Sequence, residues 1–275
     1  MRGAAAVLQT HAMTSSPSPD TWQRPGLRAA LLYAVAAGLL GTIVSSVSRL
    51  ELTRRAVPTS RLPEGPVIVV ANHTSFADGI LLALVGRRLG RSLRLMATGG
   101  VFRSGLVGPL ARRLGFIPVL RGTDAAASSL DAAATALAAG EAVGLFPEGR
   151  ITRDAQHWPE RSRTGAVRLA IRTGAPVVPV ALVGAQQVVG RRGIAARLLR
   201  NTILRPRVLV AVGEPVDVRR LAGLADGEAP DEATVRRVAD EVMALLVSQV
   251  AELRGEPAPH PAGVPEEALT ARGVA

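Results

Sequence analysis

The stretch Gly65–Leu82, GPVIVVANHTSFADGILL, decides the fold because its residue pattern changes twice, from strand-like to turn-like and then to helix-like. Val67–Ala71 is a short run rich in β-branched residues that follows a Pro-Glu-Gly turn signal, so it predicts a buried strand. Residues 72–77 are polar and turn-like, and the residues from Gly79 onward predict a helix. Strand, turn and helix in this order are typical of an α/β fold, in which ligands bind where strands end.

Two polar side chains lie at this predicted junction, His73 and Asp78, in a His-x4-Asp spacing. A histidine that is held by a nearby carboxylate can take a proton from a hydroxyl group, so the pair is a candidate general base. A second interpretation is structural, because Ser75 and Asp78 also fit a helix capping box, which would leave His73 as an incidental loop residue. The stretch alone leaves both interpretations open.

Composition narrows the classes of partner. The chain has 275 residues, enough for one large domain with appendages, and 48% hydrophobic but only 3% aromatic residues. All 33 basic residues are Arg, and the net charge of +11 favours anionic partners such as phospholipid head groups, phosphorylated substrates or nucleic acid, although an Arg-only chain can also reflect genomic base composition. The absence of Cys excludes disulfides and thiolate catalysis, and four scattered His predict no metal site.

The chain divides into four predicted segments. Residues 1–26 are rich in Ser, Pro and Ala and predict a disordered leader, and residues 255–275 predict a flexible tail. Residues 27–50 predict a hydrophobic membrane-associated helix, because Ala29–Ser48 carries no charge and ~20 residues cross a bilayer core. This helix could span the membrane, lie at its interface or on the domain, or be a cleaved signal peptide. Residues 51–254 form the predicted main domain.

Strands alternate with helices through the main domain, which predicts an α/β fold with a central, mostly parallel sheet flanked by helices. Further strands are expected at 93–97, 116–120, 142–146, 176–183 and 208–212, and further helices at 106–114, 128–139, 166–173 and 231–253. Pro176 and Pro179 place the strand at 176–183 near an edge of the sheet or at a bulge.

Three further motifs accompany these strands. Arg121 ends the strand at 116–120, Phe146-Pro147-Glu148-Gly149-Arg150 follows the next predicted strand, and a Val-Pro-rich strand lies at 176–180. Each has an ordinary explanation by itself: an exposed turn, a tight turn set by Pro and Gly, and a core strand.

Taken together and in order, the motifs resemble the glycerolipid acyltransferase family, whose best-known members are the 1-acyl-sn-glycerol-3-phosphate acyltransferases. The first family motif, Asn-His-x-Ser-x-x-Asp, is matched in full by Asn72, His73, Ser75 and Asp78. Arg121 matches the second, residues 146–149 match the start of Phe-Pro-Glu-Gly-Thr-Arg-Ser, and Pro176 and Pro179 match the fourth. The resemblance covers about residues 62–212 and implies a glycerol-3-phosphate acyltransferase-like fold, with an acyltransferase domain at 51–254.

The resemblance implies transfer of a fatty acyl group from acyl-CoA or acyl carrier protein to the sn-2 hydroxyl of 1-acyl-glycerol-3-phosphate, giving phosphatidic acid. The sequence has no Gly-x-Ser-x-Gly elbow and no Cys, so direct attack by the acceptor hydroxyl is expected. His73, with a reference pKa of ~6.5, would be the base, and Asp78 would orient it. By the same resemblance Arg121 would bind the acceptor phosphate, and Glu148 and Gly149 would belong to the substrate site, with Glu148 positioning either the glycerol or the loop.

The third motif departs from the family. This chain has Arg150-Ile151-Thr152 where the family has Thr-Arg-Ser, so Ile151 stands in place of the usual phosphate-site Arg. Arg150, Arg153 and Arg163 are the alternative anion-binding candidates, each with a solvated surface side chain as the ordinary explanation. The departure leaves the acceptor open between lysophosphatidic acid and another lysophospholipid.

The expected partners are lysophospholipid and acyl thioester substrates, membrane lipid and, as one of two acyl carriers, acyl carrier protein. No cofactor is expected, and the catalytic domain is expected at the cytoplasmic face of the cell membrane. A basic stretch between Arg191 and Arg207 could rest on anionic lipid or be a solvated face. The competing hypotheses are a non-enzymatic membrane scaffold and an Arg-rich protein that binds nucleic acid or anionic surfaces, which scarce aromatics and dispersed Arg disfavour.

Overall fold

The computed structural model of the chain describes residues 22, 25–53, 61–105, 107–119, 123–189, 194–225 and 227–259. Most of the predicted leader and tail and the predicted phosphate ligand Arg121 lie outside these ranges. Those predictions therefore stay predictions.

Within the described ranges, the main feature is a seven-stranded sheet in the order β1-β7-β6-β2-β5-β3-β4. All neighbouring pairs are parallel except β6 and β7, which are antiparallel, so the predicted mostly parallel sheet is confirmed. The strands are β1 Arg49–Leu52, β2 Val67–Ala71, β3 Leu93–Thr98, β4 Ile117–Val119, β5 Ala142–Leu145, β6 Val177–Val183 and β7 Arg207–Val212.

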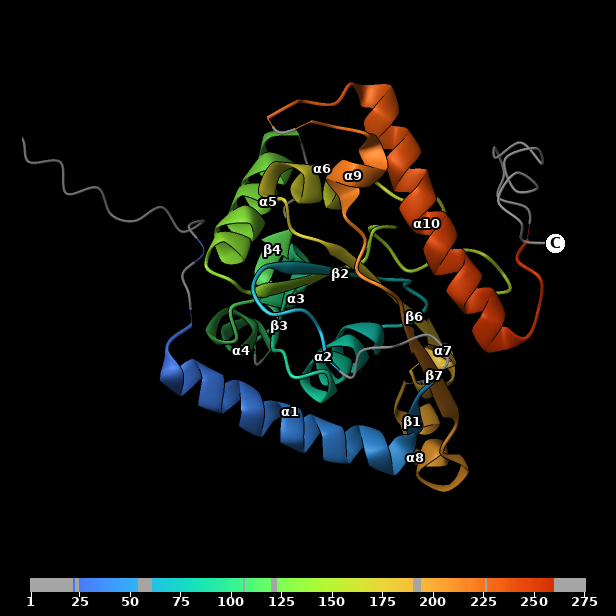
Figure 1. Cartoon of the computed structure of the whole chain (residues 1–275). Helices are drawn as coiled ribbons and strands as arrows, with labels where there is room; N and C mark the ends of the chain where they lie inside the picture. The colour runs from blue at the N-terminus through green and yellow to red at the C-terminus, as the bar shows by residue number, and fades with distance from the viewer. Residues whose placement is uncertain are drawn as a thin grey trace, which may run out of the picture.

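Helices cover both faces of the sheet (Figure 1). They are α1 Leu27–Val47, α2 Asp78–Arg88, α3 Gly99–Arg103, α4 Val107–Arg113, α5 Thr123–Ala138, α6 Gly165–Thr173, α7 Ala185–Val188, α8 Ile194–Leu204, α9 Val218–Ala222 and α10 Glu232–Arg254. α5, α6, α9 and α10 lie on one side of the sheet, and α1 and α2 lie on the other.

The central strand β2 shows why the apolar run forms a strand here. Ile68 and Val70 point into the core beneath α5, α6 and α10, whereas Val67 and Val69 point into the core beneath α2. Successive side chains of a strand face opposite ways, so a strand covered on both faces must be apolar at every position. All five residues of β2 are buried.

Of the two positions expected for the strand with Pro176 and Pro179, the edge of the sheet is wrong and a bulge is confirmed. β6 lies between β7 and β2 in the interior of the sheet, not at its edge. Pro179 is tolerated in β6 because the β6–β7 ladder is interrupted beside it. Between the bridge Val177–Val216 and the pair Val180–Val212 there are two residues on β6 but three on the opposite segment. This is a bulge, where the missing N–H of Pro179 breaks no ladder bond.

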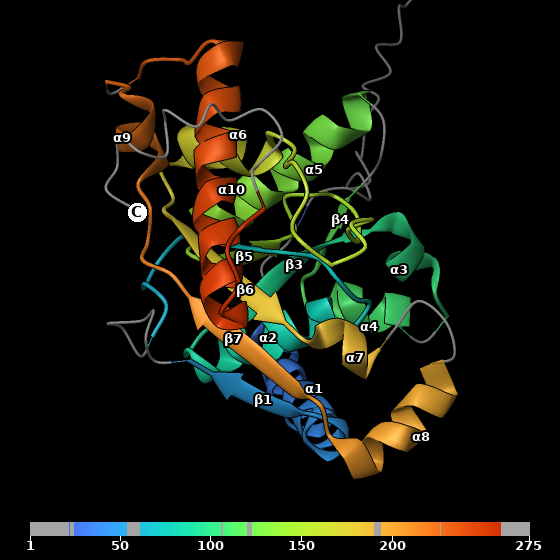
Figure 2. The ribbon, with the colours of Figure 1, turned by 90° about the vertical axis from the view of Figure 1, so that its right-hand side faces the viewer.

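The N-terminal helix α1 lies along the side of the domain (Figures 1 and 2). It ends at Val47, and residues expected at the end of a helix over 27–50 instead begin the edge strand β1, which pairs with β7. Among the described residues, α1 is the one helix that is long and apolar enough to cross a membrane, and most of its apolar surface is not buried by the protein. The sequence patterns did not predict β1 or the helices α3, α7, α8 and α9.

Candidate active site

The candidate site forms where β2 and β5 end. The two strands are parallel neighbours, so the segments that follow them, 72–77 and 146–149, meet at the same edge of the sheet. The His73 ring stacks on the Phe146 ring with centroids 4.2 Å apart and planes 18° apart. The first and third sequence motifs are thus brought into direct contact.

His73 and Asp78 form a hydrogen-bonded pair. His73 Nδ1 lies 2.9 Å from Asp78 Oδ2, and the side chain of Asp78 is fully buried while that of His73 is 20% exposed. A carboxylate at Nδ1 favours the tautomer with the proton on Nδ1 and leaves the Nε2 lone pair available. The geometry suits an imidazole that takes a proton from a bound hydroxyl group.

The same carboxylate also holds the backbone of the loop. Asp78 Oδ2 accepts hydrogen bonds from Thr74 N at 2.6 Å and from Ser75 N at 2.7 Å. Asp78 is the first residue of α2. Of the two hydrogen bonds of the capping box, the one from Ser75 N to the Asp78 carboxylate is present. The one from Asp78 N to Ser75 Oγ is replaced, because Ser75 Oγ accepts from Ala77 N and donates to Val189 O. Capping and histidine orientation are therefore two effects of one side chain.

Burial raises the pKa of the Asp78 carboxyl, and the hydrogen bond from His73 acts in the opposite direction. Asp78 Oδ1 is buried without a hydrogen-bond partner among the described residues. A proton that His73 takes up would therefore place its positive charge beside a buried carboxylate, which is a strong stabilising interaction in a site of low polarity.

Asn72 explains the residue that precedes the histidine in the motif. Its Oδ1 accepts from Leu182 N at 2.7 Å and its Nδ2 donates to Leu182 O at 2.9 Å. The side chain is buried and ties the end of β2 to β6 where the two strands diverge. Sequence reasoning matched Asn72 to the motif without finding this role, because its partner lies 110 residues away.

Glu148 holds two loops through its two oxygens. Oε1 accepts from His73 N at 2.8 Å, and Oε2 accepts from Glu160 N at 3.0 Å. Burial raises the pKa of Glu148 to about 7, although the two backbone hydrogen bonds act to lower it. Of the two roles expected for Glu148, the contacts favour positioning of the loop over contact with glycerol.

Gly149 must be glycine for two reasons. Its φ is +70°, and a Cβ there would lie 2.7 Å from Arg163 Nε. A side chain would therefore be strained in its backbone conformation and would also displace Arg163. The arrangement brings the Arg163 side chain across the third motif.

The candidate anion-binding residues lie in different situations. Arg150 donates to both oxygens of Glu160, at 3.0 and 3.2 Å, so its charge is already paired. Arg163 is exposed, and its guanidinium has no hydrogen bond among the described residues. Of these two, Arg163 is the side chain with donors left for a phosphate group.

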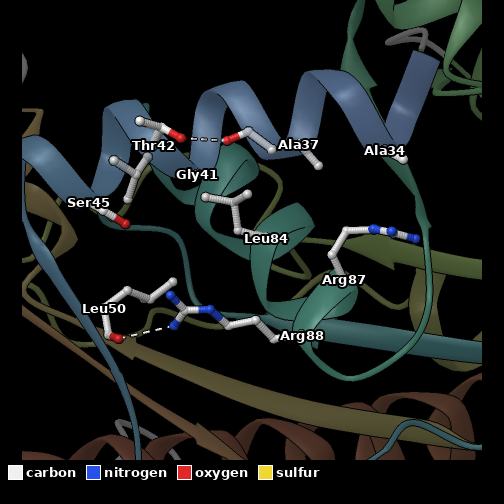
Figure 3. A pocket seen from close by; sticks show the side chains of 11 residues that line it. Ala34, Ala37, Gly41, Thr42, Ser45, Leu50, Leu84, Arg87 and Arg88 are labelled. Carbon is white, nitrogen blue, oxygen red and sulfur yellow. Dashed lines mark hydrogen bonds between the residues drawn. The ribbon is translucent and has the colours of Figure 1, made fainter. Parts of the chain in front are cut away.

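A groove of about 590 Å³ lies elsewhere, between α1 and α2 (Figure 3). Its lining includes the small residues Ala37 and Gly41 on α1, and Arg87 and Arg88 near the end of α2. Because His73 contacts the opposite end of α2, this groove is separate from the candidate active site.

The matching family model and the named relatives by sequence are acyltransferases. The family model described as Acyltransferase matches residues 49–183, which include the first and third motifs and β6. A 1-acyl-sn-glycerol-3-phosphate acyltransferase of Brassica napus chloroplasts is 30% identical over 132 residues, 47% of this chain and 37% of the relative. An uncharacterised protein of Mycobacterium tuberculosis is 32% identical over 135 residues, 46% of this chain and 35% of the relative. The match thus spans little more than a third of each relative's length.

Among solved structures, the chain is similar to the 1-acyl-sn-glycerophosphate acyltransferase PlsC from Thermotoga maritima. The TM-score is 0.54 at 22% sequence identity, over 84% of this chain and 80% of that one. This likeness supports the fold.

Proposed function

This chain belongs to the glycerolipid acyltransferase family, and on that premise we propose that it is a 1-acylglycerol-3-phosphate O-acyltransferase. It transfers a fatty acyl group from acyl-CoA or acyl carrier protein to the sn-2 hydroxyl of 1-acyl-glycerol-3-phosphate, giving phosphatidic acid. The observation that carries the proposal is the His73–Asp78 pair, at 2.9 Å, with the outer nitrogen of the ring left for a substrate.

The reaction needs one proton carrier. The acceptor oxygen attacks the thioester carbonyl carbon while its proton moves to His73 Nε2, and Asp78 stabilises the imidazolium that forms. The tetrahedral intermediate then expels the thiolate, the C–S bond breaks, and the thiolate takes the proton back from His73. No covalent acyl-enzyme is required, in keeping with a chain that has no Cys.

Arg163 is our proposed ligand for the acceptor phosphate among the described residues, since it lies against Gly149 beside the catalytic loop. Arg121 remains a predicted second ligand outside the described residues. Another lysophospholipid is the second candidate acceptor, because Ile151 replaces the Arg of the family motif and Arg150 is paired with Glu160.

We further propose that α1 lies in the plane of the membrane. Tyr33 Oη donates to Leu93 O near one end of α1, and Val47 is buried at the other end, so α1 contacts the domain along its length. If α1 crossed a hydrocarbon core of about 30 Å, the parts of the domain packed on it, including Arg87 and Arg88, would be drawn into lipid. An in-plane helix avoids that cost, with the catalytic domain at the cytoplasmic face.

The test uses purified full-length protein in vesicles with acyl-CoA or acyl carrier protein and a panel of lysolipids. Thiol release and diacyl product are followed for the wild type, for His73→Ala and for the control His157→Asn, because Asn tolerates the φ of 62° at that loop position. We expect turnover of lysophosphatidic acid that is lost in His73→Ala and kept in His157→Asn. Turnover only of lysolipids with larger head groups would identify one of these as the acceptor in place of lysophosphatidic acid. Unchanged activity in His73→Ala would refute the mechanism.

A further inference from the structure

Helix α8 exposes large apolar side chains to solvent and buries a polar one, the reverse of what is usual in a water-soluble domain. Leu199 is 74% exposed and Ile203 is 84% exposed, whereas the polar Asn201 is 1% exposed. Leu199 and Ile203 are four residues apart and therefore lie on one helix face, together with exposed Ala195 and Ala196. A helix at the surface of a soluble domain normally turns such a face toward the core.

The outer face of α8 adjoins a similar face on α1. Leu31, Val35, Leu39 and Ile43 are all exposed and follow each other at intervals of four residues along α1. The two helices are in contact: Arg205 Nη2, just beyond α8, donates to Ser45 O at 2.6 Å, and Leu198 packs into the cluster that holds Val44 and Val47 of α1. Both views place α1 and α8 together at the lower end of the molecule (Figures 1 and 2).

We propose that α8 is a second membrane-binding element and that its outer face, with that of α1, forms one surface for a bilayer containing anionic phospholipid. We define this docking surface as Leu31, Val35, Leu39, Ile43, Leu199 and Ile203. Continuity with α1 identifies the occupant as lipid, because apolar side chains this exposed are stable at the boundary of head groups and acyl chains.

The charges beside the docking surface match an anionic leaflet. Arg200 lies on α8 itself, is exposed and has no hydrogen bond among the described residues, and Arg87 and Arg88 border the groove behind α1. The basic residues at the margins of an apolar helix face bind anionic head groups while the apolar side chains enter the interface.

The position of α8 also links this surface to the candidate active site. Asn201 Nδ2 donates to Gln187 O at 2.9 Å and to Val188 O at 3.2 Å, and the neighbouring Val189 O accepts from Ser75 Oγ at 2.5 Å. A bilayer against α8 would therefore lie one short helix, α7, away from the loop that carries His73. Phe76 of that loop is itself 62% exposed. A lipid acceptor could then reach His73 without leaving the membrane surface.

The experiment measures flotation of the full-length protein with vesicles of phosphatidylglycerol and phosphatidylcholine, and with vesicles of phosphatidylcholine alone. The test variant is Leu199→Ser with Ile203→Ser, and the matched control is Leu245→Ser, an exposed leucine on α10 outside the docking surface. We expect the double variant to bind the mixed vesicles about tenfold more weakly or worse, and the control to stay within about twofold of wild type. Arg200→Gln should reduce the preference for the anionic vesicles without affecting binding to phosphatidylcholine.

Equal vesicle binding by the double variant and wild type would overturn the proposal. If that result came with a change from dimer to monomer in sedimentation, the face would be covered by a second copy of the chain. Because both substituted side chains are exposed, the thermal unfolding of the double variant should match that of wild type, which excludes misfolding as the cause of lost binding. Vesicle binding does not depend on turnover, so failure of the proposed acyltransfer would leave this result standing.

Discussion

Two regions depart in opposite ways from the usual burial of apolar side chains and exposure of polar ones: the edge of the sheet around His73 and the outer face of α1 and α8. At the sheet edge, Asp78 and Glu148 are polar and buried, and each is held by several hydrogen bonds. On the outer face, Leu199 and Ile203 are apolar and exposed. A buried carboxylate needs donors around it, and an exposed apolar face needs a non-aqueous partner. Each exception therefore underlies one of the two proposals: proton transfer at the sheet edge and lipid binding at the outer face.

The largest effect is expected from Asp78→Asn. The amide keeps the size of the side chain but cannot stabilise an imidazolium, and it can hold the wrong tautomer of His73. We expect kcat to fall by about 10³- to 10⁴-fold, by analogy with histidine–carboxylate pairs in hydrolases. The control is Asp131→Asn, whose carboxylate pairs with Arg172 at the surface and should leave kcat unchanged. A loss of less than about tenfold would mean that Asp78 serves only the backbone of the loop.

Glu148→Gln tests whether burial of this carboxyl lowers the free energy of unfolding by an amount that depends on pH. The fold raises its pKa from 4.5 to about 7, so the folded protein binds the proton more tightly than the unfolded chain between these values. Wild type should therefore lose stability as pH rises from about 4.5 to about 7, by up to about 3 kcal/mol, with no further loss above that range. Urea unfolding of wild type, Glu148→Gln and the exposed-site control Glu64→Gln at pH 5 to 8 measures this. A difference in the free energy of unfolding between wild type and Glu148→Gln that stays constant with pH would contradict this prediction.

Arg163→Gln tests the binding of phosphate at the sheet edge. Losing a charge-assisted hydrogen bond should raise KM for lysophosphatidic acid by about 10- to 100-fold, with a smaller effect on kcat. The control is Arg161→Gln, two residues away, whose side chain is 71% exposed and 3.8 Å from Asp240. The same increase in both variants would indicate a general electrostatic effect instead of a phosphate site.

The smallest effect on folding is expected at the outer face. Leu39→Ala, at a side chain 64% exposed on α1, should change the free energy of unfolding in detergent by less than about 0.5 kcal/mol. Leu82→Ala, at a fully buried position on α2, should cost about 2–5 kcal/mol. Comparable losses in the two variants would show that the outer face of α1 packs against protein in solution.

Local patterns predicted much of the fold. Strand β2 and helices α6 and α10 follow the predicted positions closely, because each is encoded by the periodicity or backbone preference of adjacent residues. β1 was missed because four residues after a long apolar helix carry no strand signal of their own, and their pairing with β7 brings together residues more than 150 positions apart. α8 was not predicted, because the basic stretch that contains it was interpreted by its charge and not by the helical spacing of its apolar residues.

The sequence by itself determined the α/β class, the apolar N-terminal helix and the ordered motifs that place the chain in its family, since all of these depend on residue type and local spacing. Only the tertiary structure decided that Glu148 accepts a hydrogen bond from His73 N, that Arg150 is paired with Glu160, and that α1 and α8 are in contact. These relations join segments between about 10 and 160 residues apart. Burial and pairing at such separations are set by how the whole chain packs, and no local pattern carries that information.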